Sequence, residues 1–492
     1  MAAKGKTLAN LGLTTAQASH LLVQGLAVDS REVRPGYLFA ALPGARVHGA
    51  EFAEYACRQG ASAILTDPQG ADFIARTLLE HKADICVVDD PRQALAGAAA
   101  LFFGPQPKVM VAVTGTNGKT SVSTFCQQIW TQIGLSAVNM GTTGVEGAWS
   151  APLNHTTPEP ITLHRALAQA AEAGVTHAAM EASSHGLDQK RLDGVVLSVA
   201  GFTNFTQDHL DYHATFDAYF AAKAGLFDRV LGPQGIAVIN VDDAKAADLL
   251  KGCAARGQST ITVGRGEADF QILGQKYDST GQDILFSWQG DNNQVRVPLV
   301  GGFQGENLML AAAMVLAAGG EAEEVFASLK AVRSVRGRME LAATRSNGAS
   351  VYVDYAHTPD AVATALRALR PHVMGRLVVV LGAGGDRDPG KRVLMGQAAA
   401  EFADIVFVTD DNPRGEDPAD IRTMVMAGVA DATDVADRAE AILRAVDCLQ
   451  SGDTLLIAGK GHESGQIIGD DVFPFDDVEQ ASIAVAALEG EY

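Results

Sequence analysis

The chain has 492 residues, of which 47% are hydrophobic and 20% charged, and its formal net charge is −20 at pH 7. This length exceeds what one hydrophobic core usually serves and predicts three domains. The composition excludes a disordered chain. The strong negative charge argues against a nucleic-acid-binding protein, which is normally basic, so we expect no nucleic-acid partner.

The cysteines and the hydropathy of the chain indicate in which cellular compartment the protein is expected. The five cysteines are scattered along the chain with no Cys-x-x-Cys spacing, which predicts a reducing environment and no zinc site. No segment approaches the roughly 20 apolar residues of a membrane helix, and the N-terminal segment lacks the apolar core of a signal peptide. We therefore expect a cytoplasmic protein without a membrane partner.

Residues 1–105 are predicted to form the first domain. The segment 28–44 contains two short apolar strands around an Asp-Ser-Arg turn, and residues 83–104 contain a strand, a turn and an alanine-rich helix. Pro105 and Pro107 mark a linker at the end of this domain.

Residues 106–335 are predicted to form a central domain in which strands and helices alternate, as in a mostly parallel sheet with crossover helices. An apolar run at 109–113 is the first strand. Further strands that end in polar residues are expected within 176–186, 195–213 and 235–243. The stretch 261–300 differs, because short alternating strands broken by a polar turn predict a small antiparallel addition.

Residues 336–492 are predicted to form a Rossmann-like C-terminal domain. Four β runs each stop at a charged, glycine-rich turn, within 351–360, 376–388, 403–414 and 453–463. Ligands bind outside the carboxyl ends of parallel strands, so these turns predict a binding wall. The predicted fold class is therefore α/β with three domains.

The segment after the strand at 109–113 has the pattern of a phosphate-binding loop. A glycine-rich turn at 115–118 is followed by Lys119, Thr120 and a helix. Glycines let backbone N–H groups point at phosphate oxygens, the lysine can reach the β- and γ-phosphates, and the threonine hydroxyl can hold Mg²⁺. The match to GxxxxGK[ST] is incomplete because Val113 replaces the first glycine. An ordinary glycine turn is the alternative, and the strand–loop–helix context favours nucleotide binding.

Three further features of the central domain each allow two interpretations. Glu181 at a predicted strand end suits a Mg²⁺ ligand or is an exposed acid. The segment 208–213, Asp-His-Leu-Asp-Tyr-His, is a metal site or a capping cluster at the surface. Lys223 lies in an apolar helix pattern, where a lone lysine usually extends its ammonium to water.

Three features of the C-terminal domain are equally open. His357 either stacks on a base or caps the helix that Thr358 and Pro359 begin. The charged turn at 386–392 is a solvated loop or, because of the glycines before it, a place of close ligand approach. The segment 411–414, Asp-Asn-Pro-Arg, is a surface turn or a rigid mount for an arginine that binds a carboxylate with two hydrogen bonds.

Nine motifs occur in one order along the chain: TGTNGKTS, MEASSHGL, DHLDYH, AYFAAKAGLF, GENLMLAAA, VDYAHTPD, GGDRD, DNPR and AGKGHE. With this ordered set the chain resembles the Mur ligases, the ATP-dependent amide-forming enzymes of peptidoglycan assembly. The resemblance implies that meso-2,6-diaminopimelate is added to the D-glutamate γ-carboxylate of UDP-N-acetylmuramoyl-L-alanyl-D-glutamate through an acyl phosphate. It also implies ATP as co-substrate, Mg²⁺, and CO₂ bound as a carbamate on Lys223. We expect a monomer.

The resemblance assigns site residues by motif. The implied catalytic residues are Lys119, Lys223, Glu181 and His209, and the implied metal ligands are Thr120, Glu181, His209 and Lys223. The implied ATP site comprises Gly115, Thr116, Asn117, Gly118, Lys119, Thr120, Ser121, Asn307, Arg338, Asp354 and His357. The implied UDP-substrate site comprises Ser30, Thr156, Thr157, Ser184, Gln189 and Arg191. The implied diaminopimelate site comprises Arg387, Asp411, Asn412, Pro413, Arg414, Gly459 and Glu463.

Two kinds of alternative function are kept. Within the same fold, the chain could be a lysine-adding ligase or a relative of folylpolyglutamate synthase, and the Asp-Asn-Pro-Arg segment argues against the first. A P-loop regulatory NTPase is the second kind, and it gives no reason for the charged strand ends of the C-terminal domain.

Overall fold

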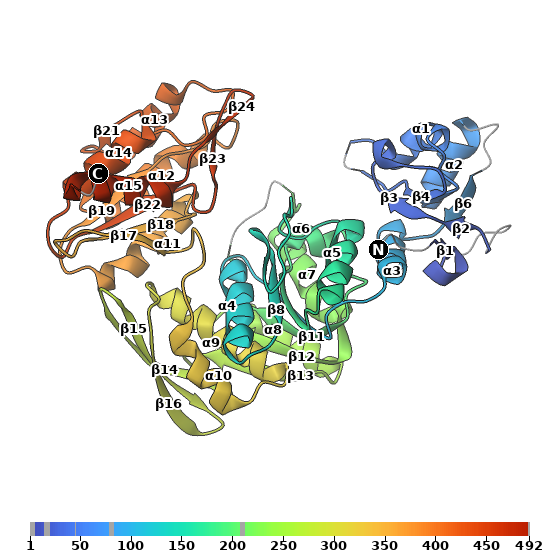
Figure 1. Cartoon of the computed structure of the whole chain (residues 1–492), viewed down its shortest axis with the longest axis horizontal. Helices are drawn as coiled ribbons and strands as arrows, with labels where there is room; N and C mark the ends of the chain where they lie inside the picture. The colour runs from blue at the N-terminus through green and yellow to red at the C-terminus, as the bar shows by residue number, and fades with distance from the viewer. Residues whose placement is uncertain (1–4, 14–19, 45, 78–82, 207–211, 491–492) are drawn as a thin grey trace. The chain divides into compact units, whose positions relative to one another are not determined.

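The computed structural model describes residues 5–13, 20–44, 46–77, 83–206 and 212–490. The chain divides into two compact units, and Figure 1 labels the helices and strands described below. Unit 1 comprises Met1–Ala268 and Leu310–Val325, and unit 2 comprises Asp269–Met309 and Phe326–Tyr492. Helices α9 (Gly302–Ala317) and α10 (Ala322–Ser328) contribute residues to both. The α/β class is confirmed, and the three predicted domain ranges stay predictions.

The N-terminal part of unit 1 contains a four-stranded parallel sheet in the order β3-β4-β5-β6. Its strands are β3 (Gly25–Ala27), β4 (Tyr37–Ala40), β5 (Ala63–Thr66) and β6 (Asp84–Val87). The other elements of this part are β1 (Lys6–Thr7), β2 (Leu22–Val23), α1 (Ala53–Arg58), α2 (Pro68–Thr77) and α3 (Pro91–Phe103). Strand β4 lies within the predicted segment 28–44, whereas β3 ends one residue before it, and Asp29 accepts a hydrogen bond from Arg31 N in the turn between the two strands.

Seven strands of unit 1 form its large sheet, in the order β13-β12-β11-β7-β10-β8-β9. They are β7 (Val109–Thr114), β8 (Ala137–Gly141), β9 (Gly144–Gly147), β10 (His177–Glu181), β11 (Leu197–Phe202), β12 (Leu231–Asn240) and β13 (Ser259–Gly264). All pair in parallel except the edge strand β9. The helices are α4 (Lys119–Gln132), α5 (Pro160–Glu172), α6 (Ser184–Asp188), α7 (Phe216–Gly225) and α8 (Ala246–Ala255).

Strand β7 lies at the centre of this sheet because β10 and β11 flank it. Its residues 110–114 are buried, as expected of a strand covered on both faces, so the apolar run that predicted it is continuous. The carboxyl ends of β7, β10 and β11 therefore meet at one edge, where a ligand site of an α/β sheet is expected.

Unit 2 begins with the antiparallel strands β14 (Phe270–Asp278), β15 (Gly281–Trp288) and β16 (Asp291–Val297). They confirm the predicted antiparallel addition except at its start, because residues 259–264 form the parallel strand β13. The apolar segment 261–263 pairs with β12, and this pairing, which lies outside the local sequence pattern, decides its direction.

The six-stranded sheet of unit 2 has the order β17-β18-β22-β19-β20-β21, and all but β17 are parallel. Its strands are β17 (Glu340–Thr344), β18 (Ser350–Asp354), β19 (Leu377–Leu381), β20 (Ile405–Val408), β21 (Thr433–Asp434) and β22 (Thr454–Ala458). A hairpin follows, formed by β23 (Gly465–Ile468) and β24 (Asp471–Pro474). The helices are α11 (Pro359–Leu369), α12 (Gly390–Phe402), α13 (Pro418–Met426), α14 (Arg438–Asp447) and α15 (Asp477–Glu489). Thr358 and Pro359 begin α11 as predicted, but the N-cap is Thr358, so the interpretation of His357 as the cap is wrong.

His372 joins the two sheets of unit 2. Its buried ring accepts a hydrogen bond at Nε2 from Gly301 N (3.0 Å) and donates from Nδ1 to the Asp278 carbonyl (2.7 Å). Because Gly301 N is a donor, the ring must be the neutral Nδ1–H tautomer. Burial lowers the pKa of His372 and favours this neutral form.

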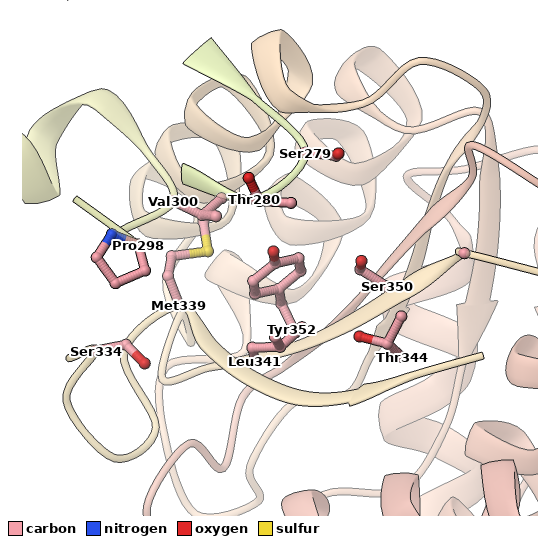
Figure 2. A pocket seen from close by; sticks show the side chains of 11 residues that line it. Ser279, Thr280, Pro298, Val300, Ser334, Met339, Leu341, Thr344, Ser350 and Tyr352 are labelled. Carbon is pink, nitrogen blue, oxygen red and sulfur yellow. The ribbon is translucent and has the colours of Figure 1, made fainter. Parts of the chain in front are cut away.

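A cavity of about 210 Å³ lies in unit 2 (Figure 2). Hydroxyl groups and apolar side chains line it, including Ser279, Thr280, Met339, Ser350 and Tyr352. None of the predicted site residues lines this cavity. Among the described residues, no helix is long and apolar enough to cross a membrane.

Candidate active site

The phosphate-loop candidate connects β7 to α4. Gly115 and Gly118 have φ of 152° and 85°, which L side chains rarely adopt, and a Cβ on Gly115 would lie 1.8 Å from Thr203 Oγ1. Gly118 precedes the first residue of α4, Lys119, so the loop ends at a helix N-terminus. Lys119 Nζ donates to the carbonyls of Gly115 (2.9 Å) and Thr116 (2.8 Å). The loop thus places a lysine at the N-terminus of a helix, an arrangement that suits phosphate.

The loop after β11 braces this turn. Asn117 N donates to Asn204 Oδ1 (3.0 Å), and Thr203 Oγ1 donates to the Asn117 carbonyl (2.6 Å). Thr116 Oγ1 lies 3.2 Å from Tyr219 Oη. Thr203, Asn204 and Tyr219 were not predicted as site residues. The first two follow directly after β11, and ligand sites of parallel sheets lie at the carboxyl ends of strands, so their position could have indicated them.

Glu181 and Thr120 meet at the same sheet edge. Glu181, the last residue of β10, is 1% exposed; its Oε2 accepts from Thr120 Oγ1 (2.9 Å) and its Oε1 from Thr142 N (2.7 Å). The interpretation of Glu181 as an exposed acid is therefore wrong. A buried carboxylate beside a hydroxyl supplies the oxygen donors that Mg²⁺ prefers. Ser121, also assigned to the ATP site, is buried in the first turn of α4.

Lys223 lies beneath the loop. It is 2% exposed, donates from Nζ to the Gly115 carbonyl (2.6 Å), and places Nζ 4.6 Å from the centroid of the Tyr219 ring. The helical pattern alone predicted an ammonium in water, and that prediction is wrong because α7 turns this residue toward the phosphate loop. His209 lies outside the described residues. Among the described residues, no group of three or more His, Cys, Asp or Glu side chains could hold a metal.

The predicted UDP-substrate residues gather around the end of β10. Thr157 Oγ1 donates to the Glu181 carbonyl (2.9 Å), and Thr142 Oγ1 lies 3.0 Å from Thr156 Oγ1. Arg191 donates to the Thr157 carbonyl (2.6 Å) and to Gln189 Oε1 (2.8 Å). Both acceptors are neutral, and burial lowers the pKa of Arg191. A partly buried guanidinium on neutral partners favours an anionic ligand.

Two other substrate candidates differ in what the structure shows. Ser184 opens α6, and its buried Oγ has no hydrogen-bond partner among the described residues. A buried hydroxyl without a partner is unfavourable unless a ligand or water satisfies it. Ser30 is buried in the turn after β3, and no described contact joins it to the residues around β10.

The remaining ATP candidates belong to unit 2. The Arg338 guanidinium lies 4.6 Å from the centroid of the Tyr355 ring, and Asp354 accepts a hydrogen bond from Met339 N (2.8 Å). His357 donates from Nδ1 to the Tyr355 carbonyl (2.7 Å). Burial raises the pKa of Asp354 and lowers that of His357. Arg338, Asp354 and His357 therefore surround one aromatic residue, whereas Asn307, buried on α9, has no described contact with them.

The predicted diaminopimelate residues meet where β20 and β22 end. Asn412 Nδ2 donates to Glu463 Oε2 (2.9 Å), and Arg414 Nη1 donates to the Gly385 carbonyl (2.9 Å). Gly459 has a φ of 119°, which L side chains rarely adopt, and a Cβ there would lie 2.5 Å from Asp411 Oδ2. A Cβ on Gly385 would lie 1.9 Å from the Pro413 carbonyl oxygen. Arg387 donates weakly to the Asp386 carbonyl (3.4 Å) and is exposed.

Arg414 is held in an unusual backbone conformation. Its φ is +50°, which is uncommon for a residue other than glycine. Its N–H donates to the Ile467 carbonyl (3.1 Å), and its own carbonyl accepts from Gly469 N (2.8 Å). The β23–β24 hairpin therefore fixes the loop, and strain of this kind is frequent at ligand sites.

Three buried charged side chains in this part of unit 2 were not predicted. Lys460, 0% exposed, donates to Asn412 Oδ1 (3.0 Å) and to the Gly465 carbonyl (2.5 Å). Arg438 and Asp477 form an ion pair with two hydrogen bonds of 2.7 Å. Lys460 stands in the AGKGHE motif, which gave a signal, whereas Arg438 and Asp477 are 39 residues apart and gave none.

Comparison with known proteins decides the family. The chain is 45% identical to "UDP-N-acetylmuramoyl-L-alanyl-D-glutamate--2,6-diaminopimelate ligase" of Caulobacter vibrioides, over 96% of this chain and 97% of that protein. It is 47% identical to the protein of the same name from Zymomonas mobilis, over 94% and 95% of the two chains. The chain belongs to the Mur ligase family. Family models match residues 22–103 (Mur ligase family, catalytic domain), 113–315 (Mur ligase middle domain) and 337–461 (Mur ligase, glutamate ligase domain).

Solved structures agree with this membership of the Mur ligases. A structure of UDP-N-acetylmuramoyl-L-alanyl-D-glutamate--2,6-diaminopimelate ligase superposes with a TM-score of 0.74 at 34% identity, covering 99% of both chains. A MurF ligase of Thermotoga maritima in complex with ADP has a TM-score of 0.62 at 19% identity, over 95% of this chain and 98% of that one. The second likeness shows the fold alone.

Proposed function

We propose that this Mur ligase joins meso-2,6-diaminopimelate to the D-glutamate γ-carboxylate of UDP-N-acetylmuramoyl-L-alanyl-D-glutamate, with ATP cleaved to ADP and phosphate. Relatives of that name, 45% and 47% identical over nearly the whole length of this chain, support the reaction. The observation that carries the choice of amine is the 411–414 loop. There Arg414 is fixed by its backbone bonds to the hairpin, and the carboxylate of Glu463 is held against Asn412.

Phosphoryl transfer comes first in this proposal. The γ-carboxylate attacks the γ-phosphorus of ATP, the bond to the bridging oxygen breaks, and an acyl phosphate and ADP form. Lys119 and the amides at the start of α4 stabilise the charge on the transferring group, since positioning and electrostatics account for most of this catalysis. Thr120, Glu181, His209 and a carbamate on Lys223 would hold Mg²⁺, which would neutralise phosphate charge when bound.

Amide formation follows. The amine of diaminopimelate attacks the acyl carbon and loses a proton, and the tetrahedral intermediate collapses with release of phosphate. Holding the two reactants in place accounts for much of the acceleration. Arg191, Gln189, Thr156, Thr157 and Ser184 would hold the UDP substrate near the end of β10. We also infer that Ser30 contributes to the uridine site.

Arg414 would select the amine. Diaminopimelate carries a distal carboxylate that lysine lacks, and an arginine can bind this group with two parallel N–H bonds. Glu463 or Asp411 would bind the adjacent ammonium. In unit 2, we infer that Arg338, Asp354, His357 and Asn307 contact the nucleotide, and that Arg387 and Gly459 complete the amine site.

The test measures ADP release and product mass. Purified protein is incubated with ATP, Mg²⁺ and the UDP-dipeptide, with diaminopimelate, lysine or no amine. We expect ADP release and a product that both require diaminopimelate. Amine-independent ADP release would instead indicate a regulatory NTPase, and equal use of lysine would indicate the lysine-adding alternative. We also propose that the protein is a cytoplasmic monomer with three domains, at 1–105, 106–335 and 336–492. The residue ranges that the family models match support these three domains.

A further inference from the structure

We propose that Lys460 is a positioning residue for the amine substrate: its buried ammonium fixes the side-chain amide of Asn412 and thereby the directions of Glu463 and Arg414. The inference rests on the proposed function, because it deepens the assignment of the 411–414 loop to diaminopimelate. It adds a residue that makes no contact with the amine itself.

The ammonium of Lys460 lies at the junction of three segments of unit 2. Lys460 follows β22 and is 0% exposed. Its Nζ donates to Asn412 Oδ1 (3.0 Å) after β20 and to the Gly465 carbonyl (2.5 Å) at the start of β23, and lies 3.5 Å from Glu463 Oε2. A lysine is rarely fully buried unless its charge is paired and hydrogen-bonded, and these contacts meet that condition.

These contacts leave one orientation for the Asn412 amide. Oδ1 accepts from Lys460 Nζ and from Ile467 N (2.9 Å), both of which are donors. An ammonium has three donors and no acceptor, so a flipped amide would place its NH₂ group against two donors. The Asn412 NH₂ group must therefore face Glu463 Oε2, at 2.9 Å.

The fixed amide orients both charged residues of the predicted amine site. One oxygen of Glu463 is occupied by Asn412, and no described residue donates a hydrogen bond to Oε1, which leaves that oxygen for a ligand ammonium. Ile467, whose N–H binds the Asn412 amide, accepts from Arg414 N through its carbonyl (3.1 Å). The orientation of the Asn412 amide is therefore linked through Ile467 to the position of the Arg414 backbone.

A purely structural role for Lys460 makes a different prediction. If the lysine only tied the hairpin to the sheet, its loss would lower stability and affect all substrates alike. If it orients Asn412, its loss would weaken the use of diaminopimelate and leave ATP binding intact. The KM values for the two substrates therefore separate these roles.

The experiment compares Lys460→Met, which keeps the length of the side chain and removes its charge, with Lys330→Met, an exposed lysine of unit 2. We expect Lys460→Met to raise the KM for diaminopimelate by about tenfold to a hundredfold, the scale of misplacing a reactant, with the KM for ATP unchanged. Lys330→Met should match wild type. An unchanged KM for diaminopimelate, or an equal loss for ATP, would overturn the role of Lys460.

A second variant keeps the test decisive if Lys460→Met does not fold. Asn412→Asp retains acceptors for Lys460 and Ile467 N but replaces the donor to Glu463 with a second carboxylate oxygen. We expect the same rise in the KM for diaminopimelate, and a wild-type value would overturn the inference. Wild-type enzyme without any diaminopimelate-dependent turnover would overturn the proposed function and this inference together. Normal wild-type turnover with unaffected variants would overturn the inference alone.

Discussion

Replacement of Lys223 by alanine tests the centre of the proposed phosphate chemistry. The Nζ atoms of Lys223 and Lys119 both donate to the Gly115 carbonyl, at 2.6 and 2.9 Å. Two atoms at these distances from one oxygen are at most 5.5 Å apart, the sum of the two distances. Two cations therefore converge on the phosphate loop when Lys223 is unmodified.

Coulomb's law gives the size of the repulsion between these two ammonium groups. At an effective dielectric constant of about 20, unit charges about 5.5 Å apart repel by about 3 kcal/mol. A carbamate on Lys223, formed from its amine and CO₂ with release of a proton, would turn this repulsion into an attraction of similar size. Loss of about 3 kcal/mol of charge stabilisation corresponds to a rate loss of about a hundredfold. We expect Lys223→Ala to lower kcat by at least that factor.

The assay measures ADP release by wild type and Lys223→Ala, each with and without small carboxylic acids. Short acids should partly restore the variant, because they can place a carboxylate in the space left by the side chain. Wild-type activity should also fall when CO₂ is removed from the buffer and recover with bicarbonate, and ¹³C-labelled bicarbonate should give a carbamate signal. Full activity with an unmodified amine and no dependence on CO₂ would refute the reasoning.

Four other changes have defined outcomes. Lys119→Ala should lower kcat by at least about a hundredfold through loss of a charge on the transferring phosphate, and near-normal turnover of the folded variant would contradict this. Arg414→Ala should raise the KM for diaminopimelate and narrow a wild-type preference over lysine of about a thousandfold, whereas full selectivity in competition assays would show that another group selects the amine. Burial lowers the pKa of His164 from 6.5 to about 4, so between these values the unfolded chain binds a proton that the folded chain does not, and the free energy of unfolding falls as the pH drops through this range. Between pH 7 and pH 5, thermal melts should therefore show a smaller loss of stability for His164→Leu than for wild type. Equal losses would show that His164 is not the source of the pH dependence. Asp477→Asn should lower the free energy of unfolding by roughly 3–5 kcal/mol because Arg438 stays buried without its partner, and a urea midpoint equal to that of wild type would exclude that cost.

Elements whose signals lie in neighbouring residues could be predicted from the sequence. An apolar run, a glycine turn and Gly118-Lys119-Thr120 predicted the strand, loop and helix that the structure contains, because the turn needs glycine and the strand needs continuous burial. The apolar run before Glu181 likewise placed this residue at the end of a strand, where the structure has it. The Mur ligase resemblance also came from local motifs, and the full-length relatives confirm it.

Features that depend on contacts between distant segments could be seen only in the folded chain. The helix around Lys223 is apolar on its own, and its packing under the phosphate loop brings Nζ to Gly115, 108 residues away. Residues 259–264 became a parallel strand through pairing with β12. The positioning role proposed for Lys460 depends on its hydrogen bond to Asn412, 48 residues away. Charged side chains show no periodicity that reveals their partners, because the fold alone brings a buried charge within hydrogen-bond distance of the group that stabilises it.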